Sequence, residues 1–396
     1  MERQLSRNFC IGILLCIVLG IAAPRALAFL PSVLGILFFV TAYFSQKQFF
    51  LPEKKTTILL FSIIALGLIS SFWSPDQAFS IERSLKIATV FLPGLLFLEL
   101  CNNAVKPSNR LIYGIIALQF FIAVFLMIEK NSGHWMIEFV LGKEVFGHKL
   151  NKSFVILSLF SLPVLFMIQN LNLKKAKKIS LFLFVLAVTI LSLTFTESQT
   201  AQLSFLAGFL FLIFFPARSK VAIKSLCVLT VIFCLIFPFL IKPIQDRLPA
   251  ETLVQGIGRQ ASVMNRFEVW NFAAETGLKS PLYGNGIEAV RFMKSDTYMK
   301  YQEAYGALHP HNAILQLWAE FGLIGLLLGC IFILFIFAGI LNHNNPDTRR
   351  LYISVFIGCF VCSLTGFGLW QGWQLGMFIV ITGFTLLTAK TVAENS

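Results

Sequence analysis

The chain has 396 residues, of which 57% are hydrophobic and 13% are charged, whereas about a quarter of the residues in a soluble domain are charged. Its mean hydropathy of +0.79 argues against a soluble fold, which could not bury so much apolar surface. The formal net charge of +13 comes without an RNA-binding motif or a soluble basic domain, so we expect no nucleic-acid partner.

Apolar stretches recur along the whole chain at the length of about twenty residues that crosses a bilayer. They predict about twelve transmembrane helices, at roughly residues 8–23, 26–45, 57–73, 86–101, 111–129, 153–170, 180–195, 199–216, 222–241, 311–341, 350–368 and 370–390. The first stretch lacks a small-residue cleavage site, so we interpret it as a retained helix rather than a signal peptide. The predicted fold class is an all-α polytopic membrane protein.

The position of one long loop and the distribution of Lys and Arg predict the domain division and the orientation in the membrane. Residues 1–241 would form a bundle of about nine helices, residues 242–310 a large external loop with amphipathic helices, and residues 311–396 three more helices. With the N-terminus inside, seventeen Lys and Arg residues fall in short inner segments and seven in short outer loops. The positive-inside rule therefore predicts cytoplasmic termini and a large loop on the external side of the membrane.

A polar turn, Thr194 to Thr200, separates the seventh and eighth stretches on the outer side. Polar side chains at membrane depth are costly unless they line a cavity. The turn is therefore either part of a site or an ordinary solvated connection, and its residue pattern alone does not separate these two readings.

The large outer loop is too long to be a simple connection. Its residues 262–277 have the apolar periodicity of an amphipathic helix, and residues 279–286 have the proline and glycine density of a turn. Arg259, Arg266 and Arg291 lie in this loop. A guanidinium group suits a phosphate or pyrophosphate, although many loop arginines are simply solvated or bind lipid headgroups.

Two histidines end the loop, where His309, Pro310, His311 and Asn312 precede an apolar helix. An imidazole is the natural general base near neutral pH, and we expect His311 and Asn312 in the first helical turn, facing the loop. The alternatives are two interfacial histidines without a function, or a metal pair without further ligands. Glu320 is a lone carboxylate in this helix, so it must be partnered, neutral or close to the interface.

The sequence predicts no metal site and no other cofactor. The outer carboxylates are scattered singly, and the eight cysteines lie in or beside apolar stretches without a metal-binding spacing. A nucleotide-binding glycine loop is also missing from the sequence, which disfavours a nucleotide-sugar donor. We therefore expect a lipid-borne donor.

These residues resemble the O-antigen ligases and the related O-antigen polymerases. The best match is the run RFEVWNFAAETGLKSPLYGNG at 266–286, followed by His311-Asn312 and EFGLIG at 320–325. Weaker likeness extends to FWSPDQAFSIERS at 72–84 and GHKLNKS at 147–153. The resemblance implies an inverting, metal-independent transferase of the GT-C type that moves a glycan from undecaprenyl pyrophosphate to a sugar of lipid A-core.

In that family picture His311 would deprotonate or orient the acceptor hydroxyl, and Arg266 would hold the departing pyrophosphate. Asn312 and His309 would lie beside them, and His309 is the alternative base. The chain departs from the family where a Ser-Arg pair is usual, because it has Ser198-Gln199. A neutral amide brings no charge, so Arg259, Arg291 or Lys152 would have to compensate.

Four other functions stay open. A polymerase that joins repeat units on the polyprenyl carrier needs the same donor site and base, and a protein-glycosylating transferase shares the architecture. A transporter or flippase of a lipid-linked glycan should instead carry charged residues deep in several spans. A structural membrane subunit would explain the helices but not the loop. The polar groups collect on one face, which favours chemistry at the membrane surface over transport, and the similarity of the loop pattern favours a ligase over a polymerase.

Overall fold

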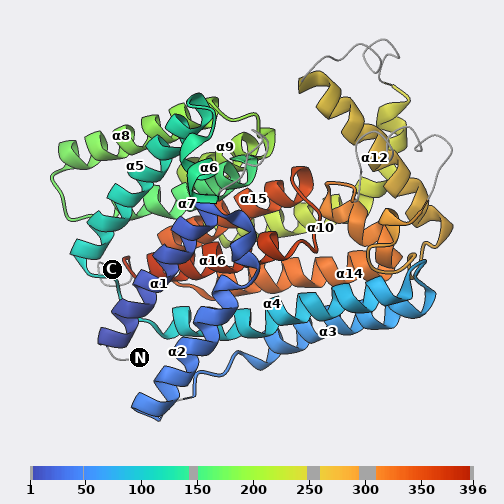
Figure 1. Ribbon diagram of the computed structural model, residues 1–396, viewed down its shortest axis with the longest axis horizontal. Helices are drawn as coiled ribbons and strands as arrows, with labels where there is room; N and C mark the ends of the chain where they lie inside the picture. Colours follow the sequence, from blue (N-terminus) through green and yellow to red (C-terminus); the bar gives the residue numbers. More distant parts are fainter. Residues whose placement is uncertain (1–2, 48, 142–149, 248–258, 294–308, 393–396) are drawn as a thin grey trace.

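The computed structural model describes residues 3–47, 49–141, 150–247, 259–293 and 309–392 (Figure 1). Its apolar helices are α1 (Arg3–Ala22), α2 (Leu30–Gln46), α3 (Lys54–Ser70), α4 (Gln77–Asn103), α5 (Asn109–Asn131), α7 (Asn151–Gln169), α8 (Lys175–Thr194), α9 (Gln199–Phe214), α10 (Lys220–Gln245), α14 (Ala313–Asn342), α15 (Pro346–Thr365) and α16 (Gly372–Ala389). The other elements are η1 (Pro24–Ala28), η2 (Ser71–Trp73), α6 (Trp135–Leu141), α12 (Arg259–Lys279) and η4 (Ala289–Arg291). Within the described ranges the regular structure is all helical, which confirms the predicted fold class.

Each predicted apolar stretch corresponds to one of these apolar helices. Among the residues that the structure describes, ten helices are long and apolar enough to cross a membrane. The apolar parts of the other two, Leu30–Ser45 and Gln199–Phe214, are shorter. A helix of this length spans about 24 Å at 1.5 Å per residue, less than the roughly 30 Å of a hydrocarbon core. The protein is therefore a multi-pass membrane protein with two short apolar helices among its longer ones.

Helix α7 lies at the centre of the bundle. Its residues from Ser153 to Ile168 are all buried, and α1, α5, α8, α9, α15 and α16 pack around it. A helix that is apolar on every side can be covered in this way, because it has no face that prefers water. The helices around α7 expose large apolar side chains outward, such as Leu15 and Phe214, as expected of surfaces that face lipid.

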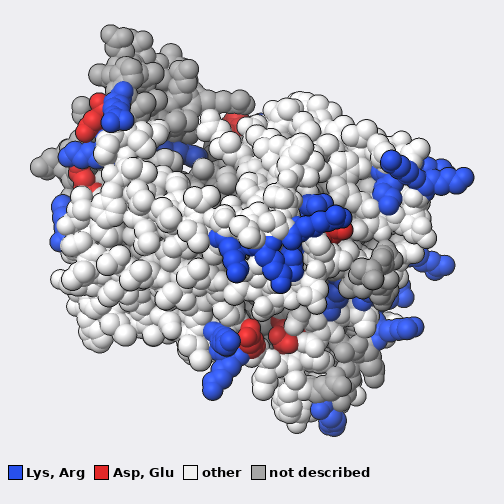
Figure 2. Space-filling view, turned by 180° about the vertical axis from the view of Figure 1, so that it is seen from behind, with Lys and Arg blue, Asp and Glu red and all other residues white. Residues whose placement is uncertain are grey.

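The two ends of the bundle differ. At one end, the first helix and Lys390 both contact the chain around the end of α4, because the Ser6 hydroxyl accepts a hydrogen bond from the Val105 amide (2.8 Å) and the Lys390 amine donates to the Asn102 carbonyl (2.6 Å). Figure 1 shows both termini at its left and α12 at its right. We call the end with α12 and the start of α14 the site end. The surface in Figure 2 is mostly uncharged, and its Lys and Arg side chains gather in groups with few acidic ones between them.

Residues 279–286, predicted as a turn, pack against an interruption in α14. Gly322 has φ 58° inside that helix, so its backbone hydrogen bonds are interrupted there. The turn replaces them, because the Leu323 and Ile324 amides donate to the Pro281 and Leu282 carbonyls at 2.8 and 3.1 Å. The two segments that carried the strongest family resemblance are thus one structural unit.

Candidate active site

His311 stands outside helix α14, and the expectation that it lies in the first helical turn is wrong. Its φ is 54°, in the left-handed region, which is costly for a residue with a side chain. Asn312 caps the helix instead, accepting hydrogen bonds from the Ile314 and Leu315 amides at 3.0 and 3.1 Å. The Asn312 amide also donates to the Leu364 carbonyl at 3.1 Å. Strained backbone of this kind is frequent at functional sites.

The hydrogen bonds of His311 define which of its nitrogens carries the proton. Its Nδ1 lies 2.6 Å from the Gly366 carbonyl oxygen. A carbonyl can only accept, so Nδ1 carries the hydrogen and Nε2 keeps its lone pair. Burial lowers the pKa of His311, the bond to Gly366 raises it, and the charge of Arg266 lowers it. The net shift is downward, so His311 is neutral at pH 7, with Nε2 as the basic nitrogen.

His309 lies against His311, with ring centroids 4.4 Å apart. The Trp373 indole donates to the Gln371 oxygen at 2.6 Å, which turns the Gln371 nitrogen toward His309 Nε2 at 3.4 Å. His309 Nε2 is therefore already an acceptor. Burial lowers the pKa of His309 to about 3, with the surrounding positive charges acting in the same direction. His309 is thus the weaker base of the two.

A buried carboxylate holds two arginines beside His309. Glu288, only 5% exposed, is 3.0 Å from Arg83 Nε and 3.3 Å from Arg291 Nη2. Both guanidinium groups also lie over the ring of Phe79, at 5.3 and 5.1 Å. Glu288 has φ 59° and is therefore a second strained residue of the site. Arg291 was among the residues predicted from the sequence, whereas Arg83 was not, because its only signal was its place in the weaker motif at 72–84.

Lys152 completes this group of cations. It lies in the first turn of α7 and over the rings of Trp373 (4.9 Å) and Phe367 (5.6 Å). The charges of Lys152, Arg83 and Arg291 all lower the pKa of His309, after burial and the neighbouring His311. Three of the positively charged residues thus surround one side of the histidine pair, while Arg266 acts on His311.

Arg266 lies on α12, the helix predicted over residues 262–277, and it is half-buried. Arg259 is the first residue of the same helix, about 10 Å further along the axis at 1.5 Å per residue. Its side chain falls outside the described part of the chain. The contribution of Arg259 to the site therefore stays a prediction.

The Ser198–Gln199 turn packs against the segment that holds His311. Ser198 caps α9 by accepting from the Ala201 amide at 3.3 Å. Thr200 donates to the Thr365 carbonyl at 2.6 Å, one residue before Gly366. Gln199 is half-buried between them in sequence. The departure from the family's Ser-Arg pair thus lies in the neighbourhood of His311.

Glu320 is partnered, as its isolation in an apolar helix required. It is 1% exposed, and it accepts hydrogen bonds from Gln316 at 2.9 Å and Trp370 at 2.6 Å. Among the described residues, no group of three or more His, Cys, Asp and Glu is placed to hold a metal ion. The polar chemistry of this region therefore comes from two neutral imidazoles, one buried acid network and several cations.

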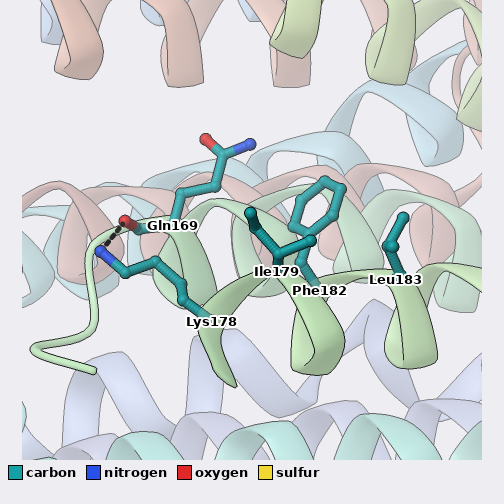
Figure 3. Close-up of a pocket in the computed structure, with 5 residues that line it drawn as sticks. All are labelled: Gln169, Lys178, Ile179, Phe182 and Leu183. Atoms are coloured by element: carbon teal, nitrogen blue, oxygen red, sulfur yellow. Dashed lines mark hydrogen bonds between the residues drawn. The ribbon is translucent and has the colours of Figure 1, made fainter. Parts of the chain in front are cut away.

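A separate cavity of about 290 Å³ lies where α7 ends and α8 begins (Figure 3). It is lined by Gln169, Lys178, Ile179, Phe182 and Leu183. The Lys178 amine already donates to the Gln169 carbonyl at 3.1 Å, capping α7. Lys152 and Gln169 are about 25 Å apart along the helix axis, so this cavity is at the far end of α7 from the histidines.

The sequence comparisons agree with this architecture. Residues 182–330 match the family model described as O-antigen ligase, a span that includes Arg266, Arg291 and both site histidines. A Rickettsia felis protein named "Putative polysaccharide ligase" is 25% identical over 358 residues, covering 88% of this chain and 84% of its own length. A Rickettsia prowazekii protein with the same description is 24% identical over 410 residues, covering 95% of each chain. Over residues 182–330 the chain is therefore similar to the O-antigen ligase family, and over most of its length it is similar to these polysaccharide ligases.

Proposed function

We propose that this protein transfers an O-antigen polysaccharide from undecaprenyl pyrophosphate to a sugar hydroxyl of lipid A-core, at the periplasmic face of the inner membrane. The observation that carries the proposal is the state of His311, a neutral imidazole whose proton is held on Nδ1 by Gly366 while Nε2 stays basic. The polysaccharide ligase description of the relatives supports the substrate class.

His311 Nε2 takes the proton of the acceptor hydroxyl in the proposed reaction. The acceptor oxygen forms a bond to the anomeric carbon of the donor as the bond from that carbon to the pyrophosphate oxygen breaks. The electron pair of the broken bond leaves with the pyrophosphate. Attack from the face opposite the leaving group inverts the anomeric configuration, so no covalent sugar-enzyme intermediate is required.

The leaving pyrophosphate gains negative charge in the transition state, and preorganised cations stabilise such charge most effectively. Arg266 acts on the His311 side, and Arg291 and Lys152 act on the His309 side. These cations take the place of the arginine that the family has where this chain has Gln199. His309 and Asn312 shape the same region, the first by packing on His311 and the second by capping α14.

His311→Asn provides a sharp test of this function. The asparagine amide can still donate to Gly366, and asparagine tolerates the left-handed backbone, but the basic Nε2 is lost. We expect a deletion strain carrying this variant to accumulate full-length polymer on its carrier and leave the core uncapped, because losing a general base costs roughly 10²- to 10⁴-fold in rate. Lipopolysaccharide gels and quantified carrier-linked glycan measure both pools.

Wild-type complementation and Lys86→Gln are the controls, since Lys86 is an exposed residue paired with Glu82 on α4. Arg266→Ala should also fail to restore capping. A core that carries a single repeat unit in the deletion strain would identify a polymerase instead. An unchanged glycan pattern in that strain would contradict both transferase readings and favour a transporter.

A further inference from the structure

The hydrogen bonds of Glu320 extend to the turn whose residues are hydrogen-bonded to both histidines. Residues 366–371 connect α15 to α16, and this connecting turn supplies the Gly366 carbonyl to His311 and the Gln371 amide to His309. Trp370 of the same turn donates to Glu320 Oε2 at 2.6 Å. Glu320 therefore contacts the residues that orient the imidazoles rather than the imidazoles themselves.

Gln316 forms the second link, one helical turn before Glu320. Its nitrogen donates to Glu320 Oε1 at 2.9 Å, and its oxygen accepts from the Leu369 amide at 2.8 Å. Both Gln316 and Glu320 are 1% exposed. A buried polar network of this kind is rigid when every member is satisfied and costly when one is not.

We propose that Glu320, with Gln316, is a positioning residue that fixes the connecting turn and thereby keeps the proton of His311 on Nδ1. The inference rests on the proposed role of His311 as the base. It extends that role to two side chains that do not touch the substrate. The sequence pointed to Glu320 as a lone carboxylate in an apolar helix, but it gave no reason to single out Gln316.

The network accepts one combination of side chains, a carboxylate and an amide. The Trp370 and Leu369 N–H groups at its two ends can only donate. The side chain at position 316 must therefore accept a hydrogen bond from Leu369, and the side chain at position 320 must accept one from Trp370. In the hydrogen bond that joins the two side chains, one must donate and the other must accept. Glutamate and glutamine together satisfy this requirement in either order. Two glutamines would place two NH₂ groups against each other in a buried site, which leaves a donor unsatisfied.

Glu320→Gln tests the inference, and the exchanged variant Gln316→Glu/Glu320→Gln is its matched partner. We expect Glu320→Gln to reduce core capping by about 10- to 100-fold, the loss usual when an outer partner that orients a functional imidazole is removed. The exchanged variant restores the hydrogen bond between positions 316 and 320 and those to Trp370 and Leu369, and it should recover most of the capping. Glu268→Gln removes an exposed carboxylate from α12 and should leave capping at the wild-type level.

A second readout does not depend on activity. Nitrogen NMR of the purified protein, labelled at histidine, reports which ring nitrogen carries the proton, and the chain has five histidines to assign. We expect His311 to carry it on Nδ1 in the wild type and in the exchanged variant, and to lose this preference in Glu320→Gln. If this pattern appears while the deletion strain shows normal capping, the positioning role stands and the ligase function fails.

Two results would overturn the inference. In the first, Glu320→Gln keeps both the wild-type tautomer and wild-type capping. In the second, the exchanged variant folds but remains as inactive as the single variant, which would mean that a carboxylate is needed at position 320 itself. Should Glu320→Gln fail to accumulate, the exchanged variant must recover accumulation, tautomer and capping together, and its failure to do so would equally reject the inference.

Discussion

Arg83 adds a positive charge to the site from a helix far from the main motif in sequence. It and Arg291 share the single carboxylate of Glu288, so this group of three side chains carries a net positive charge. Glu288 also restricts the rotation of both guanidinium groups, which reduces the entropy lost when they bind an anion. Fixed and only partly neutralised guanidinium groups are well suited to the two phosphates of the proposed donor.

Arg83→Gln should weaken donor binding while Lys86→Gln should not. A hydrogen bond to a charged group contributes about 1.5–3 kcal/mol, so the Kd for undecaprenyl pyrophosphate should rise roughly 10-fold or more in Arg83→Gln. Titration of the purified protein, followed by fluorescence of the tryptophans near the site, measures it. Lys86 lies one turn further along α4, and its loss removes the same charge. Equal increases in Kd for the two substitutions would show that Arg83 contributes only its charge to the electrostatic potential and makes no direct contact with the donor.

The low pKa of His309 should appear in the pH dependence of stability. In the unfolded chain His309 binds a proton near pH 6.5, whereas in the folded protein burial lowers its pKa to about 3. Between these values the unfolded state binds more protons, so stability is lost as the pH falls below 6.5. The thermal midpoint in detergent should therefore fall more on acidification from about pH 7 to about pH 5 in the wild type than in His309→Gln. Parallel curves for the two proteins would contradict this assignment.

At the level of elements, one position of α14 requires glycine, whereas another has room for a larger side chain. A Cβ on Gly322 would lie 2.7 Å from the Pro281 carbonyl oxygen, and the left-handed φ adds strain. A Cβ on Gly339 of the same helix would meet nothing within 4 Å. The two glycines are therefore a matched pair for testing the contact between the turn and the helix.

Gly322→Ala should destabilise the protein by roughly 2–4 kcal/mol, because an occupied space and a strained backbone both oppose it. Gly339→Ala should be neutral or stabilising by up to about 1 kcal/mol, since alanine favours a helix. Thermal unfolding in detergent compares the two. If both variants unfold at the wild-type temperature, the turn at 281–284 does not constrain α14 as the structure indicates.

The apolar helices could be predicted because a run of apolar residues about twenty long has few other uses. The details of α14 could not. Asn312 is a typical capping residue and would have moved the predicted helix start past His311, but the break at Gly322 has no local signal. Gly325, Gly329 and Gly339 occur in the same helix without a positive φ. Only the packing of a distant turn distinguishes Gly322 from them.

Part of the candidate site could be proposed from the sequence as well. His311 and Arg266 belong to contiguous motifs that stand out from their surroundings, whereas the partners that define their chemistry come from elsewhere in the chain. Gly366 is 55 residues from His311, and Gln371 is 62 residues from His309. Such pairs depend on how α14, α15 and α16 pack, which residue types and spacing do not reveal.

At the scale of the whole molecule, the two ends of the bundle differ in composition and role. The N-terminal helix and Lys390 meet at one end, where the basic segment Lys174–Lys178 also begins α8. The two site histidines, the site arginines and α12 lie at the other end, the site end. By the positive-inside rule the end with the termini should face the cytoplasm, which would expose the site to donors and acceptors in the periplasm.

Cysteine labelling can test this orientation with two matched substitutions. Lys279, to be replaced in Lys279→Cys, is the last residue of α12 at the site end. Lys177, to be replaced in Lys177→Cys, lies in the first turn of α8 at the other end, and both lysines are exposed. The eight native cysteines lie within apolar helices and seven are buried, so background labelling should be low. In spheroplasts a membrane-impermeant maleimide should label Lys279→Cys, whereas Lys177→Cys should react only after lysis. The reverse pattern would place the histidines in the cytoplasm and exclude the proposed transfer onto lipid A-core at the periplasmic face.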